Sequence, residues 1–420
     1  MEKRLSNSKS ILVKAETAKR IDFLDYVRGM AVLSVVLFHS LGASYGYGAL
    51  PWDRLFRSFD APASFIALLP LHLGWIGVPV FFVVSGFCIH LSFEKQGHEW
   101  RSFFIRRFFR IYPAYLAALI LFAFLYHDRN HDLGLQFVNH AFLIHNFNVQ
   151  TYHGINSSFW TIAIEAQLYL LYPLLVVLVG KYGWRRTLIF LAACECLVDG
   201  WNMVYQTMLG LARYGYSSSE FFSYLRYIHS PVLTFLSASP FAYWFSWALG
   251  ACAADAWLKN RQLPLVKSST LFWAFLVVAA YFARPFAPYF FILSAVFATT
   301  AISRHMSGAP VKIRLPDFWL EQLRRAGVWS YSIYLLHQPL LEMFCGSLSR
   351  HFPATPSLLK LLCCLMFCPV IVVIAGIWFR LIERPGIGLG KRLIQKLNET
   401  RAFGRNCATA PEIERAGESR

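Results

Sequence analysis

The sequence predicts an all-α, polytopic integral membrane protein with about ten transmembrane helices and both termini in the cytoplasm. Composition is the first reason: 56% of the 420 residues are hydrophobic and only 15% are charged, whereas soluble proteins average about 25% charged residues. The second reason is that long apolar runs recur along the chain. Most of these runs approach the length of about 20 residues that a helix needs to cross a bilayer.

Ten apolar runs are the expected transmembrane helices. The first follows a basic segment, residues 1–20, and is longer than the core of about 7 to 15 residues in a signal peptide, so we expect an uncleaved anchor. The seventh and eighth runs are short and meet at Arg284-Pro285. A transmembrane domain then covers residues 21–390, and a basic tail, 391–420, is expected to be disordered from about Glu399. The runs are 24–44, 73–93, 108–126, 158–179, 187–208, 233–257, 269–283, 287–303, 328–349 and 358–381.

The distribution of the 40 Lys and Arg residues sets the orientation of the chain. Most of them lie in the N-terminal segment, in the even-numbered connections and in the tail, which the positive-inside rule places in the cytoplasm. Lys267 and Arg304 both favour that side, so the stretch between them is expected to cross the membrane twice. The net charge of +17 is therefore explained by topology, and no nucleic-acid partner is expected.

The first run contains two ionisable residues, Arg28 and His39, eleven positions apart. A helix turns about 100° and rises about 1.5 Å per residue, so both side chains lie on one face, roughly 16 Å apart in depth. Ionisable groups at membrane depth cost about 2.5 to 3.5 kcal/mol each and usually face a protein interior or a wet cavity. The pair is the first site candidate.

The third run opens with a second group of cations, Arg107 and Arg110. Residues three apart share a helix face, and two guanidinium groups there can clamp an anion. Taken alone, the pair also fits an ordinary positive-inside anchor. The intramembrane Arg28 favours an anion site.

The fourth run begins at Trp160 and carries Glu165 and Tyr169. Glu165 is expected about 10 Å deep, near the depth of His39, where a carboxylate can orient an imidazole that acts as a general base. A structural hydrogen bond between helices is the alternative for Glu165. Trp160 and Tyr169 are further candidates.

Other polar residues within the runs are given supporting roles. His337 is a mid-membrane imidazole expected to support the site. Ser85 either lines a tunnel or, with Gly86, allows close helix packing. Glu195 and Asp199 are interpreted as mainly structural, near the outer end of their run, where water can reach them.

The outer loops and the cysteines predict no metal site and no disulfide. The loop 127–157 holds His127, His131, His140, His145 and His153 but lacks a compact ligand set. The nine cysteines lie mostly within or at the ends of the runs, where lipid or core packing explains them. Aromatic residues in the loop 209–232 fit either stacking on sugars or an interfacial belt; they are Tyr214, Tyr216, Phe221, Phe222, Tyr224 and Tyr227.

Six stretches, in this order, resemble the membrane-bound acyltransferase family 3, which includes bacterial O-antigen, exopolysaccharide and Nod-factor acyltransferases. The resemblance implies a fold of about ten helices, cytoplasmic acetyl-CoA as the acyl donor, and hydroxyls of extracytoplasmic carbohydrates as acceptors. It also implies a bacterial inner membrane as the location. The stretches are Leu24–Arg28 continuing to His39, Gly77–Phe87, Arg107–Arg110, Trp160–Pro173, Ser330–Pro339 and Glu383–Pro385.

By this resemblance, Arg28, His39, Arg107 and Arg110 occupy the family's functional positions. Some members carry an appended extracytoplasmic hydrolase-like domain. None is expected here, which implies direct transfer to the carbohydrate or to a separate extracytoplasmic transferase.

The expected mechanism assigns CoA phosphates to Arg107, Arg110 and Arg28, with the pantetheine arm reaching toward His39. His39 then accepts the proton of a sugar hydroxyl, with Glu165 orienting the ring. An acyl-histidine intermediate is the alternative. The rival class is a proton-coupled transporter or flippase in which Arg28, His39 and Glu165 form a relay.

Overall fold

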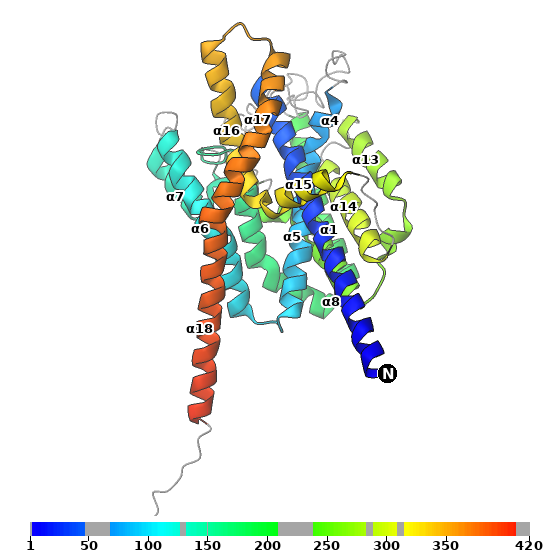
Figure 1. The fold of residues 1–420 in the computed structure, drawn as a ribbon. Coiled ribbons are helices and arrows are strands. Elements are labelled where there is room, and N and C mark those ends of the chain that lie inside the picture. The colour runs from blue at the N-terminus through cyan, green and yellow to red at the C-terminus, as the bar shows by residue number, and fades with distance from the viewer. Residues whose placement is uncertain are drawn as a thin grey trace, which may run out of the picture.

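The computed structural model describes residues 2–46, 68–126, 132–148, 150–208, 238–282, 289–308 and 315–408, and all of its regular elements there are helical. Figure 1 shows a bundle in which α1 runs through the middle and the joined α17 and α18 form one long rod. The main helices are α1 (Glu2–Tyr45), α5 (Gly77–Lys95), α6 (Trp100–Leu125), α7 (Leu133–Ala141), α8 (Phe159–Met208), α12 (Trp244–Leu258), α13 (Thr270–Phe282), α14 (Phe290–Met306), α15 (Asp317–Val328), α16 (Ser330–His351), α17 (Ser357–Trp378) and α18 (Arg384–Ala408).

Short helices connect several of these elements. They are α4 (Leu69–His72), η2 (Leu73–Ile76), η4 (His145–Phe147), η5 (Pro240–Ala242), η6 (Pro264–Lys267) and the π-helix η8 (Phe379–Glu383).

Each predicted run coincides with a helix, although several boundaries differ. The fourth and fifth runs are the two halves of α8, which breaks at Gly183, a residue with φ 74° and ψ 163°. In the sixth run, helix α12 begins at Trp244, after the short helix η5, and thus later than the expected residue 233. The Arg284-Pro285 hinge lies outside the described residues.

Among the described residues, five helical segments are long and apolar enough to cross a membrane. Two shorter apolar helices, Thr270–Tyr281 and Phe290–Met306, add to them. The chain is therefore well suited to be a polytopic membrane protein, and the total of ten spans stays a prediction. The five segments are Asp22–Tyr45, Pro70–Lys95, Trp100–Leu125, Phe159–Gly200 and Ser357–Thr400.

Helices α5 and α12 pack closely, and glycine makes their approach possible. A Cβ on Gly86 would lie 2.0 Å from the carbonyl oxygen of Trp247, and one on Gly250 would lie 1.9 Å from that of Val83. Small residues allow backbones in membrane helices to meet in this way. The contact fixes Ser85, which precedes Gly86, against the indole of Trp247.

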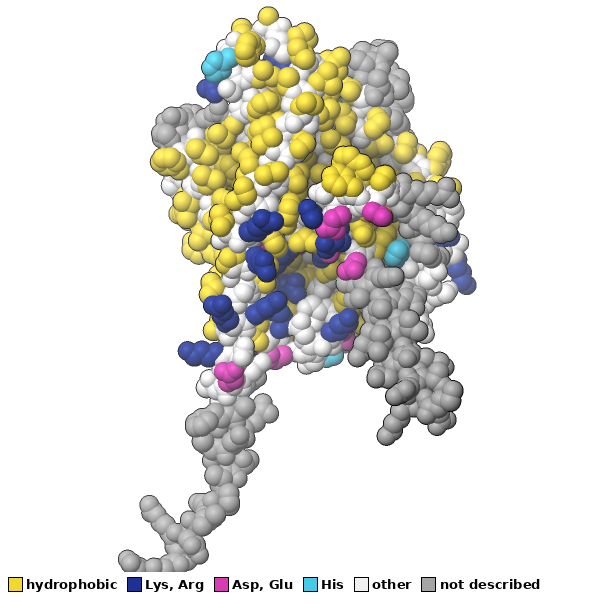
Figure 2. All heavy atoms as spheres, in the orientation of Figure 1, with side chains coloured by type: hydrophobic (Ala, Val, Ile, Leu, Met, Phe, Trp, Pro, Cys, Tyr) yellow, Lys and Arg dark blue, Asp and Glu magenta, His cyan; other side chains and the backbone are white. Residues whose placement is uncertain are grey.

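The two ends of the chain are helical in the described residues. The N-terminal segment is helical from Glu2 and continuous with the first span. The tail is helical through Ala408, and the disorder expected from about Glu399 stays a prediction. The basic face in Figure 2 lies on the side from which α18 extends, while hydrophobic side chains cover the opposite end. The orientation predicted from Lys and Arg, with both termini in the cytoplasm, stays a prediction.

Candidate active site

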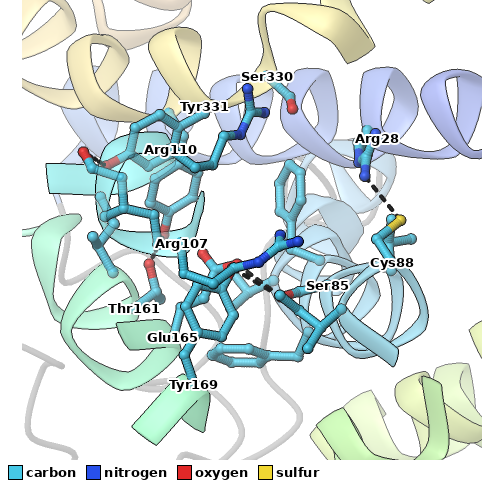
Figure 3. A pocket seen from close by; sticks show the side chains of 18 residues that line it. Arg28, Ser85, Cys88, Arg107, Arg110, Thr161, Glu165, Tyr169, Ser330 and Tyr331 are labelled. Carbon is cyan, nitrogen blue, oxygen red and sulfur yellow. Dashed lines mark hydrogen bonds between the residues drawn. The ribbon is translucent and has the colours of Figure 1, made fainter. Parts of the chain in front are cut away.

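One cavity between α1, α5, α6, α8 and α16 collects most of the candidate residues. Figure 3 shows Arg28 on one side and Arg107 and Arg110 on the other, reaching toward the same space. Sequence reasoning had not selected Cys88, Thr161, Ser330, Tyr331 or Tyr334. The lining comprises Arg28, Ser85, Cys88, Arg107, Arg110, Thr161, Glu165, Tyr169, Ser330, Tyr331 and Tyr334, with the apolar Val78, Phe81, Phe82, Val84, Ile89, Ile111 and Ile162.

Arg28 is held by two neighbours. Its Nη1 lies 2.7 Å from Asp25 Oδ1, one helical turn earlier. Its Nη2 donates a hydrogen bond of 3.0 Å to Cys88 Sγ on α5. A paired charge is the form in which an arginine is usually found at membrane depth. Asp25 is thus part of the site, and its position three residues before Arg28 was the signal that could have identified it.

Among the described residues, Arg107 is the cavity arginine that has no carboxylate partner. Its Nη2 donates to Ser92 Oγ at 3.1 Å, and its guanidinium carbon lies 5.8 Å from the centre of the Phe103 ring. Its buried Nε–H has no hydrogen-bond acceptor among the described residues. A buried donor without an acceptor is costly, so this side chain is suited to an anionic ligand that supplies one.

Arg110 is balanced by a carboxylate from the far end of the chain. Its Nη1 forms an ion pair of 2.6 Å with Glu383 Oε1. The other oxygen of Glu383 accepts a hydrogen bond of 2.5 Å from Ser332 Oγ. The two arginines of the third run therefore differ, because within the described part of the chain only Arg110 has an acidic partner.

Glu165 belongs to a hydrogen-bonded group on the cavity wall. Ser85 Oγ donates to Glu165 Oε1 at 2.7 Å, and the Tyr169 hydroxyl donates to the same oxygen. The Trp247 indole N–H donates to Ser85 Oγ at 3.2 Å. Ser85 thus lines the cavity, while its neighbour Gly86 provides the close packing.

His39 and His337 form a buried pair beside the cavity. His39 Nδ1 lies 2.9 Å from the carbonyl oxygen of Val35 and 3.2 Å from His337 Nε2. His337 Nδ1 lies 2.8 Å from the carbonyl oxygen of Tyr334. The protons that satisfy both carbonyl groups sit on Nδ1 of each ring, so His337 Nε2 can accept from His39 Nδ1–H and the lone pair of His39 is on Nε2.

The structure thus gives Glu165 and His39 different partners from those expected. The hydrogen bonds described for Glu165 go to Ser85 and Tyr169, whereas His337 contacts the ring of His39 directly. The idea that Glu165 orients His39 stays a prediction. His337 was given only a supporting role from sequence, because a lone histidine in an apolar run carries no sign of its neighbours.

Tyr334 connects the cavity with the histidine pair. Its ring lines the cavity and lies 5.3 Å, centre to centre, from the ring of His337. Its hydroxyl is 2.8 Å from Thr161 Oγ1, and its ring makes an edge contact of 5.9 Å with Phe81. The wall of the cavity therefore borders the imidazoles at Tyr334.

Trp160 lies in an aromatic cluster and does not line the cavity. Its ring stacks on Trp75 at 6.2 Å and on Tyr152 at 6.0 Å, and it contacts Tyr243 at 5.7 Å. It is 7% exposed. The cluster reaches the site through Phe38, which contacts both Trp75 and His39.

Glu195 is fully buried, so the expectation that water reaches it is wrong. It accepts hydrogen bonds from the backbone N–H of Ser246 at 3.1 Å and from its hydroxyl at 2.5 Å. These bonds between α8 and α12 agree with a structural role.

The outer-loop histidines stack on one another. The rings of His140 and His145 are 3.9 Å apart and nearly parallel. Burial lowers the pKa of His140 to about 4, and burial, with His140 beside it, holds the pKa of His145 well below its usual value. The described residues contain no cluster suited to a metal ion. His127, His131 and the aromatic residues of 209–232 lie outside the described residues.

A family model described as an acyltransferase domain matches residues 21–376. The chain belongs to the acyltransferase 3 family. Peptidoglycan O-acetyltransferase OatA of Listeria monocytogenes is 23% identical over 388 residues, 87% of this chain and 56% of that protein. Putative peptidoglycan O-acetyltransferase YrhL of Bacillus subtilis is 25% identical over 363 residues, 79% of this chain and 50% of that protein.

A shorter match is putative acetyltransferase ORF330 of Acidianus two-tailed virus, 29% identical over 155 residues, 36% of this chain and 39% of that protein. This acyltransferase 3 chain spans about half the length of the curated relatives it matches. No solved structure matches it significantly. The chain carries an acyltransferase domain, and the predicted family is confirmed.

Proposed function

We propose that this chain is a membrane-bound O-acyltransferase that moves an acyl group, most simply acetyl, from cytoplasmic acetyl-CoA to a hydroxyl of an extracytoplasmic or lipid-linked carbohydrate. One observation carries the proposal. Three arginines line one cavity, and Tyr334 in the wall of the same cavity contacts a buried histidine pair that includes His39. This arrangement suits an anionic acyl donor whose thioester is directed toward His39 as a base.

The three cavity arginines suit the phosphate groups of CoA. Arg28 and Arg110 each retain donors beyond those engaged by Asp25 and Glu383, and Arg107 has a buried Nε–H directed to no described acceptor. Guanidinium groups bind phosphate through paired, charge-assisted hydrogen bonds. The thioester would then extend past Ser85 and Glu165 toward Tyr334.

The chemical step uses His39 as a general base. The lone pair on Nε2 takes the proton of a sugar hydroxyl while the hydroxyl oxygen attacks the thioester carbonyl carbon. The tetrahedral intermediate collapses by breaking the carbon–sulfur bond, and the CoA thiolate takes the proton from His39. His337 holds the ring through Nδ1 and stabilises the imidazolium. In the alternative, His39 Nε2 attacks the thioester and releases the CoA thiolate; the sugar hydroxyl then takes the acyl group from Nε2, and its proton goes to the thiolate.

The acceptor is proposed to be a cell-envelope glycan. Two relatives are named as peptidoglycan O-acetyltransferases, which supports peptidoglycan as one candidate beside O-antigen and other surface polysaccharides. A bacterial inner membrane and, for some acceptors, a separate extracytoplasmic transferase partner complete the proposal.

The proposal is tested by supplying membranes that contain the protein with acetyl-CoA carrying a radiolabelled acetyl group. Envelope glycans should gain alkali-labile label, as expected for an ester. Free acetate and acetyl phosphate, which lack the CoA phosphates, should not replace the donor. Equal labelling from acetyl phosphate would contradict the assignment of the arginines to CoA.

A further inference from the structure

The link between α17 and α18 is a single π-helical turn, Phe379–Glu383. Such a turn inserts an extra residue, so side chains after it are rotated by about 100° from the positions of a continuous α-helix. In this chain it places Glu383, the last residue of the turn, in the interior at 1% exposure. A carboxylate at this depth is costly unless it is paired.

The partners of Glu383 tie three helices together at the cavity. Oε1 pairs with Arg110 Nη1 on α6 at 2.6 Å, and Oε2 accepts from Ser332 Oγ on α16 at 2.5 Å. Ser332 follows Ser330 and Tyr331, which line the cavity. Arg110 itself lines the cavity and is about one-third exposed, so its guanidinium has one side on Glu383 and another toward the ligand space.

We infer that Glu383 is a positioning residue for the acyl donor: it holds the Arg110 guanidinium at the cavity wall. This inference rests on the proposed function. A free arginine has many rotamers, and fixing such a side chain on binding weakens affinity. By holding Arg110 in place, Glu383 lets the donor bind without that loss.

The direction in which CoA affinity changes when Glu383 is removed distinguishes a positioning role from simple neutralisation of the Arg110 charge. If Glu383 only cancelled the charge of Arg110, its removal would leave a stronger cation and tighten the binding of CoA. If Glu383 positions Arg110, its removal weakens CoA binding although the site becomes more positive. A purely structural role would alter thermal stability and leave the donor affinity of the folded protein unchanged.

The decisive variant is Glu383→Gln, which keeps the size of the side chain and an oxygen for Ser332 but removes the charge. Binding of radiolabelled CoA to the purified full chain should weaken about three- to tenfold, with kcat at saturating acetyl-CoA within about twofold of the original. The double variant Glu383→Gln with Arg110→Gln should bind CoA no more weakly than Arg110→Gln alone, because Glu383 acts through Arg110.

Ser332→Ala provides a second test that keeps both charges and removes only the hydrogen bond to the carboxylate. It should also weaken CoA binding, but by less than Glu383→Gln does. The inference therefore remains testable if Glu383→Gln does not fold. Unchanged or tighter CoA binding in these folded variants, or additive losses in the double variant, would overturn the inference alone. Absence of CoA binding by the unaltered chain would instead overturn the proposed function.

Discussion

Arg107→Gln should weaken the binding of CoA about 10- to 150-fold. The neutral amide can still meet Ser92, which now accepts at 3.1 Å from Nη2, but it cannot provide the charged Nε–H and Nη–H donors directed to a phosphate. A hydrogen bond to a charged group contributes about 1.5 to 3 kcal/mol, and each 1.4 kcal/mol is a factor of ten in affinity. One such bond accounts for the range given.

The assay is equilibrium binding of radiolabelled CoA to purified protein, with Arg106→Gln as the matched control. Arg106 is the preceding residue on α6, carries the same charge and does not line the cavity. Its neutralisation should change the dissociation constant by less than about threefold, because partly exposed charges are screened. Equal losses for the two variants would refute the phosphate assignment and leave only a general effect of positive charge.

Two further predictions concern histidines. His337→Phe should lower kcat about 10- to 100-fold with CoA binding unchanged, because His39 Nδ1–H loses its imidazole acceptor at 3.2 Å; an unchanged kcat would remove His337 from the mechanism. Burial lowers the pKa values of His140 and His145, so below pH about 6.5 the unfolded chain binds more protons than the folded chain. For each of the two histidines, the free energy of unfolding should then fall by up to about 1.4 kcal/mol per pH unit as the pH is lowered toward about 4. In thermal melts the variant His140→Phe with His145→Phe should flatten this loss, whereas replacing the exposed His351 by Phe should not; an equal pH dependence in both would contradict the effect of burial.

The membrane helices could be predicted because each depends on a local property. An apolar run of sufficient length forms a helix wherever it packs, and the Lys and Arg of its flanks set its direction. The helical spacing of Arg107 and Arg110 placed both on the cavity in the same way. The predicted ends of the helices were less accurate, as the start of α12 at Trp244 shows.

Several partners of the site residues could not be predicted, because they come from helices distant in the sequence. Glu383 reaches Arg110 only through a π-turn that changes its direction, and the sequence Phe379–Ile382, which includes Arg380, gives no sign of that turn. Cys88 looked like a packing residue until α5 brought it to Arg28. The short polar helix α15, which packs on α1 and leads into the cavity-lining Ser330, carried no hydropathy signal.

The central claim is that His39 is the base for acyl transfer from a donor bound in the arginine-lined cavity. The most direct measurement compares acetyl transfer from labelled acetyl-CoA to envelope glycans by the unaltered protein and by His39→Ala, with CoA binding measured on both. The account predicts that His39→Ala binds CoA within about threefold of the original and forms no labelled ester above background. Ester formation at the original rate by His39→Ala would contradict it.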